Sequence, residues 1–81
     1  MYYLNFYFKE LEYDENTIMG VFSAPDNDVF CRFILDINSN TYEIFDSNKP
    51  ETDISPLPFF WLHKKLKENG KLNRTESRIC Y

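Results

Sequence analysis

Few residues in this chain of 81 could carry out chemistry, and no spacing among them matches a catalytic pattern. His63 is the only histidine, so a metal site built on it would need several carboxylates as well. Cys31 and Cys80 lack the spacing of a metal-binding pair. Cys31 lies in an apolar stretch, where a thiol is inert, and no helper base stands near Cys80. We therefore expect no metal, no cofactor and no enzymatic activity.

The segment at 46–51, DSNKPE, begins like a calcium-binding loop, because acidic and amide side chains alternate in it. It lacks the glycine of such a loop and places Pro50 among the ligands, so we reject it as a calcium site. Asp26 and Asp28 flank a turn, where carboxylates cap backbone N–H groups. The sequence contains no nucleophile elbow, phosphate-binding loop or dinucleotide fingerprint. These features favour binding over catalysis.

The composition indicates one small domain, residues 1–81, with an aromatic core. A chain of this length buries only about 60% of the surface that its unfolded form exposes. The eight Phe, six Tyr and one Trp compensate, because each ring buries on the order of 150–250 Å². Two cysteines are too few for a disulfide scaffold, and no stretch approaches the roughly 20 apolar residues of a membrane span. We expect a reduced, cytoplasmic protein.

Charge is divided unevenly along the chain. Residues 1–55 carry three cations and eleven acids, a net charge of −8, whereas residues 56–81 carry six cations and two acids, a net charge of +4. Such an asymmetry suggests charged partners, although ordinary solvated surfaces give the same pattern.

Four segments within residues 2–46 are expected to form strands, and the first and third divide their side chains between two faces with the period of two that is typical of strands. Short turn-forming sequences separate them, of which APDND at 24–28 is the clearest. We expect Phe6 and Phe8 to face inward, and Gly20 suggests a bulge in the second segment. The predicted strands are YYLNFYFK (2–9), TIMGVFS (17–23), VFCRFILDI (29–37) and TYEIFD (41–46).

One helix is predicted over residues 56–69. Ser55 is a suitable N-cap, and Pro56 fits the first helical position because it has no N–H group to satisfy. Gly70 suits the left-handed position that ends a helix. Three lysines toward the C-terminal end complement the helix dipole.

These elements predict an α+β fold, a four-stranded antiparallel meander with one C-terminal helix packed on one face. The sheet covers residues 2–46 and a loop covers residues 47–54. The tail at 71–81 is left open, because SRICY at 77–81 either adds a fifth strand or remains outside the sheet. A small β-barrel with a C-terminal helix is the alternative, since four or five strongly twisted strands can close.

Three aromatic residues follow one another near the start of the helix and cannot all face the sheet. At about 100° per residue, Phe59, Leu62 and Leu66 form one stripe, which predicts that they join the core. Phe60 and Trp61 fall on opposite flanks of that stripe. Each of these two rings either covers a sheet edge, a loop or the tail, or stays exposed as an anchor for a partner.

The second face of the predicted sheet is too apolar for a plain solvent face, since it carries Ile34 and Phe45 beside several rings. Three explanations compete: a closed barrel or the tail covers it, a homodimer forms, or another partner binds. Stacked bases of single-stranded nucleic acid would suit the rings, but the charge of −8 opposes phosphate binding. With the two undecided helix rings, the predicted partner-binding residues are Tyr3, Tyr7, Phe30, Arg32, Phe60 and Trp61.

The function that we expect is that of a small acidic protein-interaction module. It would act as an inhibitor or decoy that occupies a basic, nucleic-acid-binding surface of a partner protein, while acidic side chains steer association. Phage or plasmid proteins that block host defence nucleases offer an analogy of charge and size. The predicted steering residues are Glu10, Glu12, Asp14, Glu15, Asp26 and Asp28.

The alternative is a nucleic-acid-binding regulator that uses the basic helix and tail. Phosphate contacts would make its binding weaken steeply with salt. The residues proposed for those contacts are Lys64, Lys65, Lys67, Lys71, Arg74 and Arg78. Neither function requires a membrane or a small-molecule cofactor.

Overall fold

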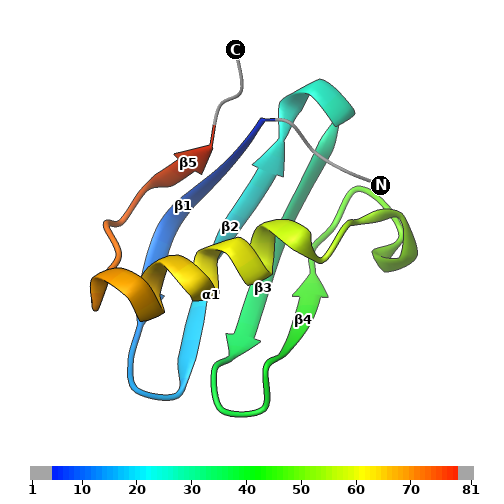
Figure 1. Cartoon of the computed structure of the whole chain (residues 1–81). Coiled ribbons are helices and arrows are strands. Elements are labelled where there is room, and N and C mark those ends of the chain that lie inside the picture. The colour runs from blue at the N-terminus through cyan, green and yellow to red at the C-terminus, as the bar shows by residue number, and fades with distance from the viewer. Residues whose placement is uncertain (1–4, 79–81) are drawn as a thin grey trace.

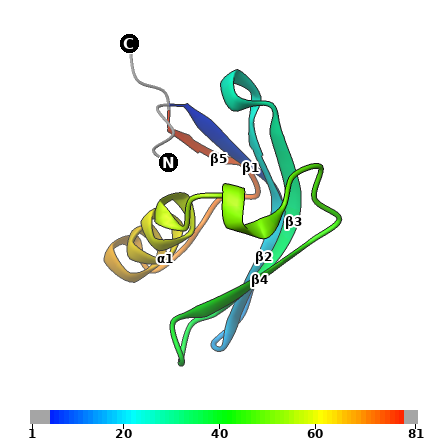
Figure 2. The same cartoon turned by 90° about the vertical axis from the view of Figure 1, so that its right-hand side faces the viewer.

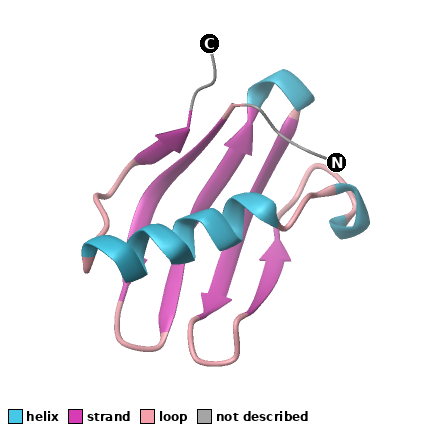
Figure 3. Cartoon of the chain, viewed as in Figure 1, coloured by secondary structure: helices cyan, strands magenta, loops and turns pink. Residues whose placement is uncertain are grey.

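The computed structural model describes residues 5–78, which form an open antiparallel sheet and one α-helix (Figures 1 and 3). The strand order is β4-β3-β2-β1-β5, and all neighbours are antiparallel. The α+β prediction is therefore confirmed, with five strands, and the barrel alternative is wrong. The elements are β1 (Phe6–Tyr13), β2 (Thr17–Ala24), β3 (Val29–Asp36), β4 (Thr41–Phe45), α1 (Leu57–Asn69) and β5 (Glu76–Arg78).

The tail of the chain supplies the fifth strand. β5 pairs with the outer side of β1, where Ser77 lies opposite Tyr7. The chain thus passes from one edge of the sheet to the other between β4 and β5, and α1 lies across one face during that passage (Figures 1 and 2). Because β5 joins the edge, it does not cover the second face. Residues 79–81, like Tyr3 and Leu4, lie outside the described residues.

Two turns at the same end of the sheet are built on aspartates (Figure 1). In the β1–β2 turn, Asp14 Oδ1 accepts hydrogen bonds from the N–H groups of Asn16 (2.7 Å) and Thr17 (2.9 Å), which lower the pKa of the Asp14 carboxyl. In the β3–β4 turn, Asp36 Oδ1 accepts one from the N–H of Asn38 (2.9 Å). Asn38 Nδ2 donates to Asn16 Oδ1 (2.8 Å), so side chains also link the two turns.

A β-bulge in β1 changes which of its side chains face the core. The pairing shifts between Lys9 and Glu12, where two residues of β1 oppose Gly20 of β2. Glu10 in the bulge has a φ of 53°, and Leu11 after it is buried. A Cβ on Gly20 would lie 2.9 Å from Leu11 Cδ2 and 2.9 Å from the Lys9 carbonyl oxygen. The bulge therefore lies in the strand opposite Gly20, rather than in β2.

The helix α1 begins at Leu57, one residue later than the sequence predicts, with Pro56 at the N-cap position. Ser55 Oγ accepts a hydrogen bond from the Leu57 N–H at 3.3 Å, one residue before the cap. At the other end, Gly70 has a φ of 74° and donates its N–H to the Leu66 carbonyl at 2.7 Å. No helix among the described residues is long and apolar enough to cross a membrane.

The core lies between α1 and the face of the sheet that α1 crosses, and it is largely aromatic. Phe59 and Leu62 of α1 are fully buried. The Phe59 ring centroid lies 5.1 Å from those of Phe22 and Phe33, and 6.0 Å from that of Phe8. The buried apolar residues of the strands in this cluster are Phe6, Phe8, Leu11, Ile18, Phe22, Ala24, Val29, Cys31, Phe33 and Leu35.

Candidate protein-interaction surface

Figure 2 shows the face of the sheet opposite α1, and this face carries large apolar side chains in contact with solvent. Phe30 of β3 is 49% exposed, Phe45 of β4 is 43% exposed and Met19 of β2 is 38% exposed. Side chains alternate between the two faces along a strand, so these three side chains lie on the face of the sheet that points away from buried core residues such as Phe33. We call this surface the open face and define it by Tyr7, Met19, Phe30, Arg32, Ile34 and Phe45.

Strand register arranges the open face in rows. Arg32 lies opposite Phe45 on the neighbouring strand. In the next row, Ile34 lies opposite Met19 on one side and Glu43 on the other. The two rows are two residues apart along β3, or about 7 Å. Exposed apolar groups, a guanidinium and a carboxylate therefore share a small area, a mixture typical of protein interfaces, in which aromatic residues, Met and Arg are enriched.

A cavity of about 240 Å³ lies in the open face, lined by Arg32, Met19 and Phe45 among other residues. Arg32 Nη2 is 3.9 Å from Glu10 Oε2, and Arg74 also lines the cavity. Both partners of the Arg32–Glu10 pair are largely exposed, so the pair contributes little to stability. Its loss would cost little if a partner's group replaced it.

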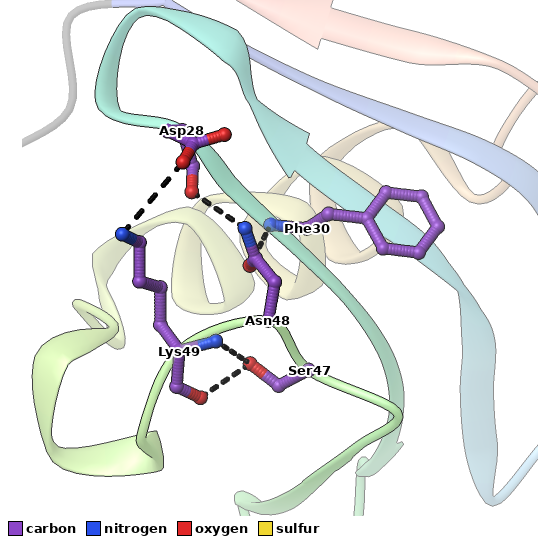
Figure 4. Close-up of polar contacts among 5 residues, drawn as sticks. All are labelled: Asp28, Phe30, Ser47, Asn48 and Lys49. Atoms are coloured by element: carbon purple, nitrogen blue, oxygen red, sulfur yellow. Dashed lines mark hydrogen bonds and ion pairs between the residues drawn. The ribbon is translucent and has the colours of Figure 1, made fainter.

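Asn48, in the loop after β4, anchors the end of β3 that carries Phe30 (Figure 4). Asn48 Oδ1 accepts the Phe30 N–H at 2.8 Å, and the Asn48 N–H donates to the Phe30 carbonyl at 3.1 Å. Asn48 Nδ2 donates to the Asp28 carbonyl at 2.8 Å, and Lys49 Nζ lies 3.7 Å from Asp28 Oδ2. Asn48 thus extends the β3–β4 ladder, and the Phe30 ring points away from it (Figure 4).

The two undecided helix rings lie on the other side of the sheet from the open face, so the predicted partner-binding residues do not form one surface. Trp61 is half-buried, with its ring centroid 5.2 Å from that of Phe6 and stacked 6.2 Å from that of Phe8. It covers the core rather than standing free. Phe60 is 38% exposed and meets the Tyr42 ring edge-on, with their centroids 6.3 Å apart. The structure brings together Tyr7, Phe30 and Arg32 only, while Tyr3 lies outside the described residues.

The predicted steering acids are spread along the sheet rather than gathered in one patch. Asp14 and Glu15 belong to the β1–β2 turn, whereas Asp26 and Asp28 lie at the opposite end, in and just after the short helix η1 (Pro25–Asn27) (Figure 1). Glu10 and Glu12 line the cavity of the open face, and Glu12 also lines a smaller hollow together with Asp14.

Among the described residues, Glu12, Glu15 and Glu43 stand near the open face or at its β1–β2 end and have neither an ion pair nor a side-chain hydrogen bond. Glu12 and Glu43 occupy the row of Met19, at its two ends. Glu15 belongs to the adjoining β1–β2 turn and is exposed. These three carboxylates can therefore meet cations of a partner without breaking an internal pair.

The cations of the nucleic-acid alternative are divided by the fold. Lys65 Nζ lies 2.8 Å from Glu76 Oε1, and Glu76 is only 6% exposed. Lys64 Nζ lies 3.9 Å from Glu68 Oε1, one turn along α1. Arg74 lines the cavity on the opposite face of the sheet. The other three cations, which are exposed, are Lys67, Lys71 and Arg78.

The described residues that were considered first for chemistry, Cys31 and His63, lie in the core and in a contact between two elements. Cys31 is buried in the core, and this burial raises the pKa of its thiol to about 11. His63 Nδ1 lies 3.1 Å from Asn40 Oδ1, a contact that joins α1 to the β3–β4 turn. Within residues 5–78, no group of three or more His, Cys, Asp and Glu side chains could hold a metal ion. Cys80 lies outside the described residues.

Sequence reasoning did not single out Met19, Glu43 or Asn48. Met19 is next to Gly20, which interrupts the alternation of side chains along this strand. The bulge in β1, which sets Glu12 opposite Met19, leaves no clear signal in the sequence of β1. The exposed position of Glu43 could have been predicted from the alternation of residues 41–46, since Glu43 is two residues from Phe45 and lies on the same face of the strand. The hydrogen bonds of Asn48 join residues 18 and 20 positions apart, which no local pattern reveals.

Comparisons with protein-family models, with curated proteins and with solved structures find no match to this chain.

Proposed function

We propose that this protein is an interaction module that places its open face against a partner protein with a basic surface. The observation that carries the proposal is the exposure of Phe30 and Phe45 around Arg32, on a face with no second layer of described residues. Exposing such rings to water is unfavourable, and contiguous exposed apolar groups usually mark an interaction site.

The charge of the partner follows from the carboxylates around that face. Glu12, Glu15 and Glu43 have no ion pair among the described residues, so a basic partner would gain attraction without displacing an internal cation. If that basic surface normally binds nucleic acid, the carboxylates take the place of phosphates. The protein then acts as an inhibitor or decoy by occupying the surface.

The division of the cations supports a protein partner over the nucleic-acid alternative. Lys65 is held by Glu76, and Arg74 is separated from the helix lysines by the sheet. A phosphate backbone needs several cations along one track, because neutralising phosphates supplies most of the affinity.

Affinity capture from the native cell lysate, with and without nuclease, tests whether the partner is a protein. We expect a protein to be captured equally well after nuclease treatment. Capture of nucleic acid itself, or of proteins that disappear with nuclease, would replace the proposal with the nucleic-acid alternative.

Steering by the acids can then be measured with the captured partner. The double variant Glu12→Lys/Glu15→Lys should slow association by about 10-fold or more at low salt, with a smaller effect at high salt. The matched control Glu51→Lys/Glu68→Lys makes the same change in net charge in the short helix η2 (Glu51–Asp53) and in α1. Equal slowing by both variants would show that only net charge matters, and unchanged rates would remove the steering role.

A further inference from the structure

The outer edge of β4 is the longer of the two edges of the described sheet. β4 has five residues, whereas β5 at the other edge has three described residues, one of which is the cation Arg78. No described strand pairs with the outer side of β4, which runs along the near side of the sheet in Figure 2. Short length and charge protect an edge from further pairing, so β4 is the less protected edge.

The hydrogen bonds at Phe30 show which residues of β4 direct their backbone groups outward. The N–H and carbonyl of Phe30 both bond Asn48, so they point toward the β4 side of β3. Backbone groups alternate sides along an antiparallel strand, so Ile34 also points toward β4, and its partner Glu43 points back. The N–H and carbonyl groups of Tyr42 and Ile44 therefore point away from the sheet.

Side chains flank these outward backbone groups on both faces. On the α1 side, Tyr42 and Ile44 pack partly against the core. On the open face, Phe45 is exposed and Glu43 has no ion pair among the described residues. A strand added to β4 would thus bury apolar groups on both of its faces.

The charge of Glu43 opposes a second copy of this chain as the added strand. Antiparallel self-pairing that uses both outward residues sets Tyr42 opposite Ile44 of the copy, and Ile44 opposite its Tyr42. Glu43 then stands directly opposite Glu43 of the copy, at the closest kind of cross-strand position, about 4.5 Å between Cα atoms. Like charges directly opposite are destabilising, whereas a cation there is stabilising.

We propose that the edge of β4 binds an extended segment of the partner protein, with Lys or Arg opposite Glu43 and apolar residues on either side of that cation. The adjacent apolar residues lie beside Tyr42 and Ile44, and the next one on the open face lies beside Phe45. The inference rests on the proposed function, because it assumes that the basic partner that covers the open face also pairs one of its segments with the edge of β4. Strand addition of this kind draws affinity from the main chain and specificity from alternate side chains.

A β-hairpin peptide with an Asn-Gly turn serves as the probe, because the hairpin presents a strand at reduced entropic cost. One strand carries Val-Lys-Val, and the control peptide carries Val-Glu-Val. Titration followed by NMR should show hydrogen-exchange protection of the Tyr42 and Ile44 amides on binding. We expect the lysine peptide to bind roughly 3- to 20-fold more tightly, and Glu43→Lys to reverse the preference.

Two further variants isolate the main-chain bonds. Ile44→Pro removes an outward N–H that β3 does not use, and proline is tolerated at such edge positions, so binding should be lost while the sheet remains. A peptide N-methylated at its bonding amides tests the same bonds without changing the protein, and it should also fail to bind.

Several results would overturn the edge site: no binding by about 1 mM peptide, binding without protection of the two amides, or unchanged binding to Ile44→Pro. Dimerisation of the free protein that protects these amides would identify a second copy as the occupant instead. Phe30→Ser separates the two proposals, because Phe30 does not border this edge. If Phe30→Ser weakens partner binding and Ile44→Pro does not, the open face stands and the edge falls. The reverse pattern keeps the edge and rejects the open face.

Discussion

At the scale of single residues, Asn48 ties the loop after β4 to the strand that presents Phe30. Its side chain accepts the Phe30 N–H and donates to the Asp28 carbonyl, both at 2.8 Å. Asn48→Ala should lower the free energy of unfolding by about 1–2 kcal/mol, because two exposed hydrogen bonds are lost. Denaturant unfolding measures this, and Asn73→Ala is the matched control, because only the backbone N–H of this exposed residue forms a hydrogen bond among the described residues. No difference between the variants would show that Asn48 does not anchor β3.

Glu76 is the buried carboxylate that should make stability depend on pH. Burial opposes its charge, but Lys65 at 2.8 Å and the Asn73 N–H at 2.9 Å outweigh burial and lower its pKa. Because the pKa is lower in the folded protein than in the unfolded chain, the ionised Glu76 carboxylate stabilises the folded protein at pH values above the unfolded pKa. This stabilisation is lost as the pH falls through the folded pKa. Glu76→Gln should therefore cost about 1–3 kcal/mol at pH 7, and the difference should shrink as the pH falls below the ordinary range of a glutamate carboxyl. A pH-independent difference would assign the loss to packing alone.

At the scale of elements, the bulge in β1 decides which side of the sheet Leu11 and Glu12 occupy. Gly20 makes room for it, since a Cβ there would meet both Leu11 and the Lys9 carbonyl at 2.9 Å. The backbone oxygen cannot move aside cheaply, so Gly20→Ala should destabilise the protein by about 1–3 kcal/mol. Thermal unfolding tests this. Gly70→Ala, which meets nothing within 4 Å but has a φ of 74°, should cost only about 1 kcal/mol. Gly20→Ala at or below that cost would contradict the account.

The strands themselves could be predicted from alternation, because one face of each is apolar and the other is mixed. Phe59 and Leu62 could be placed in the core from helical spacing, and both are fully buried. The position of the bulge in β1, the place of β5 beside β1 and the hydrogen bonds of Asn48 could not be predicted. Each depends on contacts between residues distant in sequence, such as Leu11 donating its N–H to the Arg74 carbonyl at 3.0 Å.

The placement of Trp61 shows why a run of aromatics did not determine the candidate site. The ring lies on the flank of the helix stripe, yet it still reaches Phe6 and Phe8, because β1 lies near that flank. Phe60 on the other flank stays exposed. Helical spacing separates the two rings but does not say which flank the sheet covers, since strand order is set by the whole topology.

At the scale of the whole molecule, one helix covers one face of a five-stranded sheet, and no other described element covers the second face (Figure 2). The exposed side chains of that open face are Phe30, Phe45 and Met19, around Arg32. Surface rings contribute little to folding, so changing them should alter binding rather than stability. We propose that this face, and not the aromatic surface of α1, meets the partner.

The most direct test compares two rings of similar exposure on opposite sides of the sheet, Phe45 at 43% and Phe60 at 38%. The dissociation constants of Phe45→Ser and Phe60→Ser for the captured partner are measured by calorimetry, after unfolding curves establish that both variants are folded. We expect Phe45→Ser to weaken binding by about 10-fold or more and Phe60→Ser to leave it within about 2-fold. Weaker binding by Phe60→Ser with no change for Phe45→Ser would contradict this proposal and place the interface on α1.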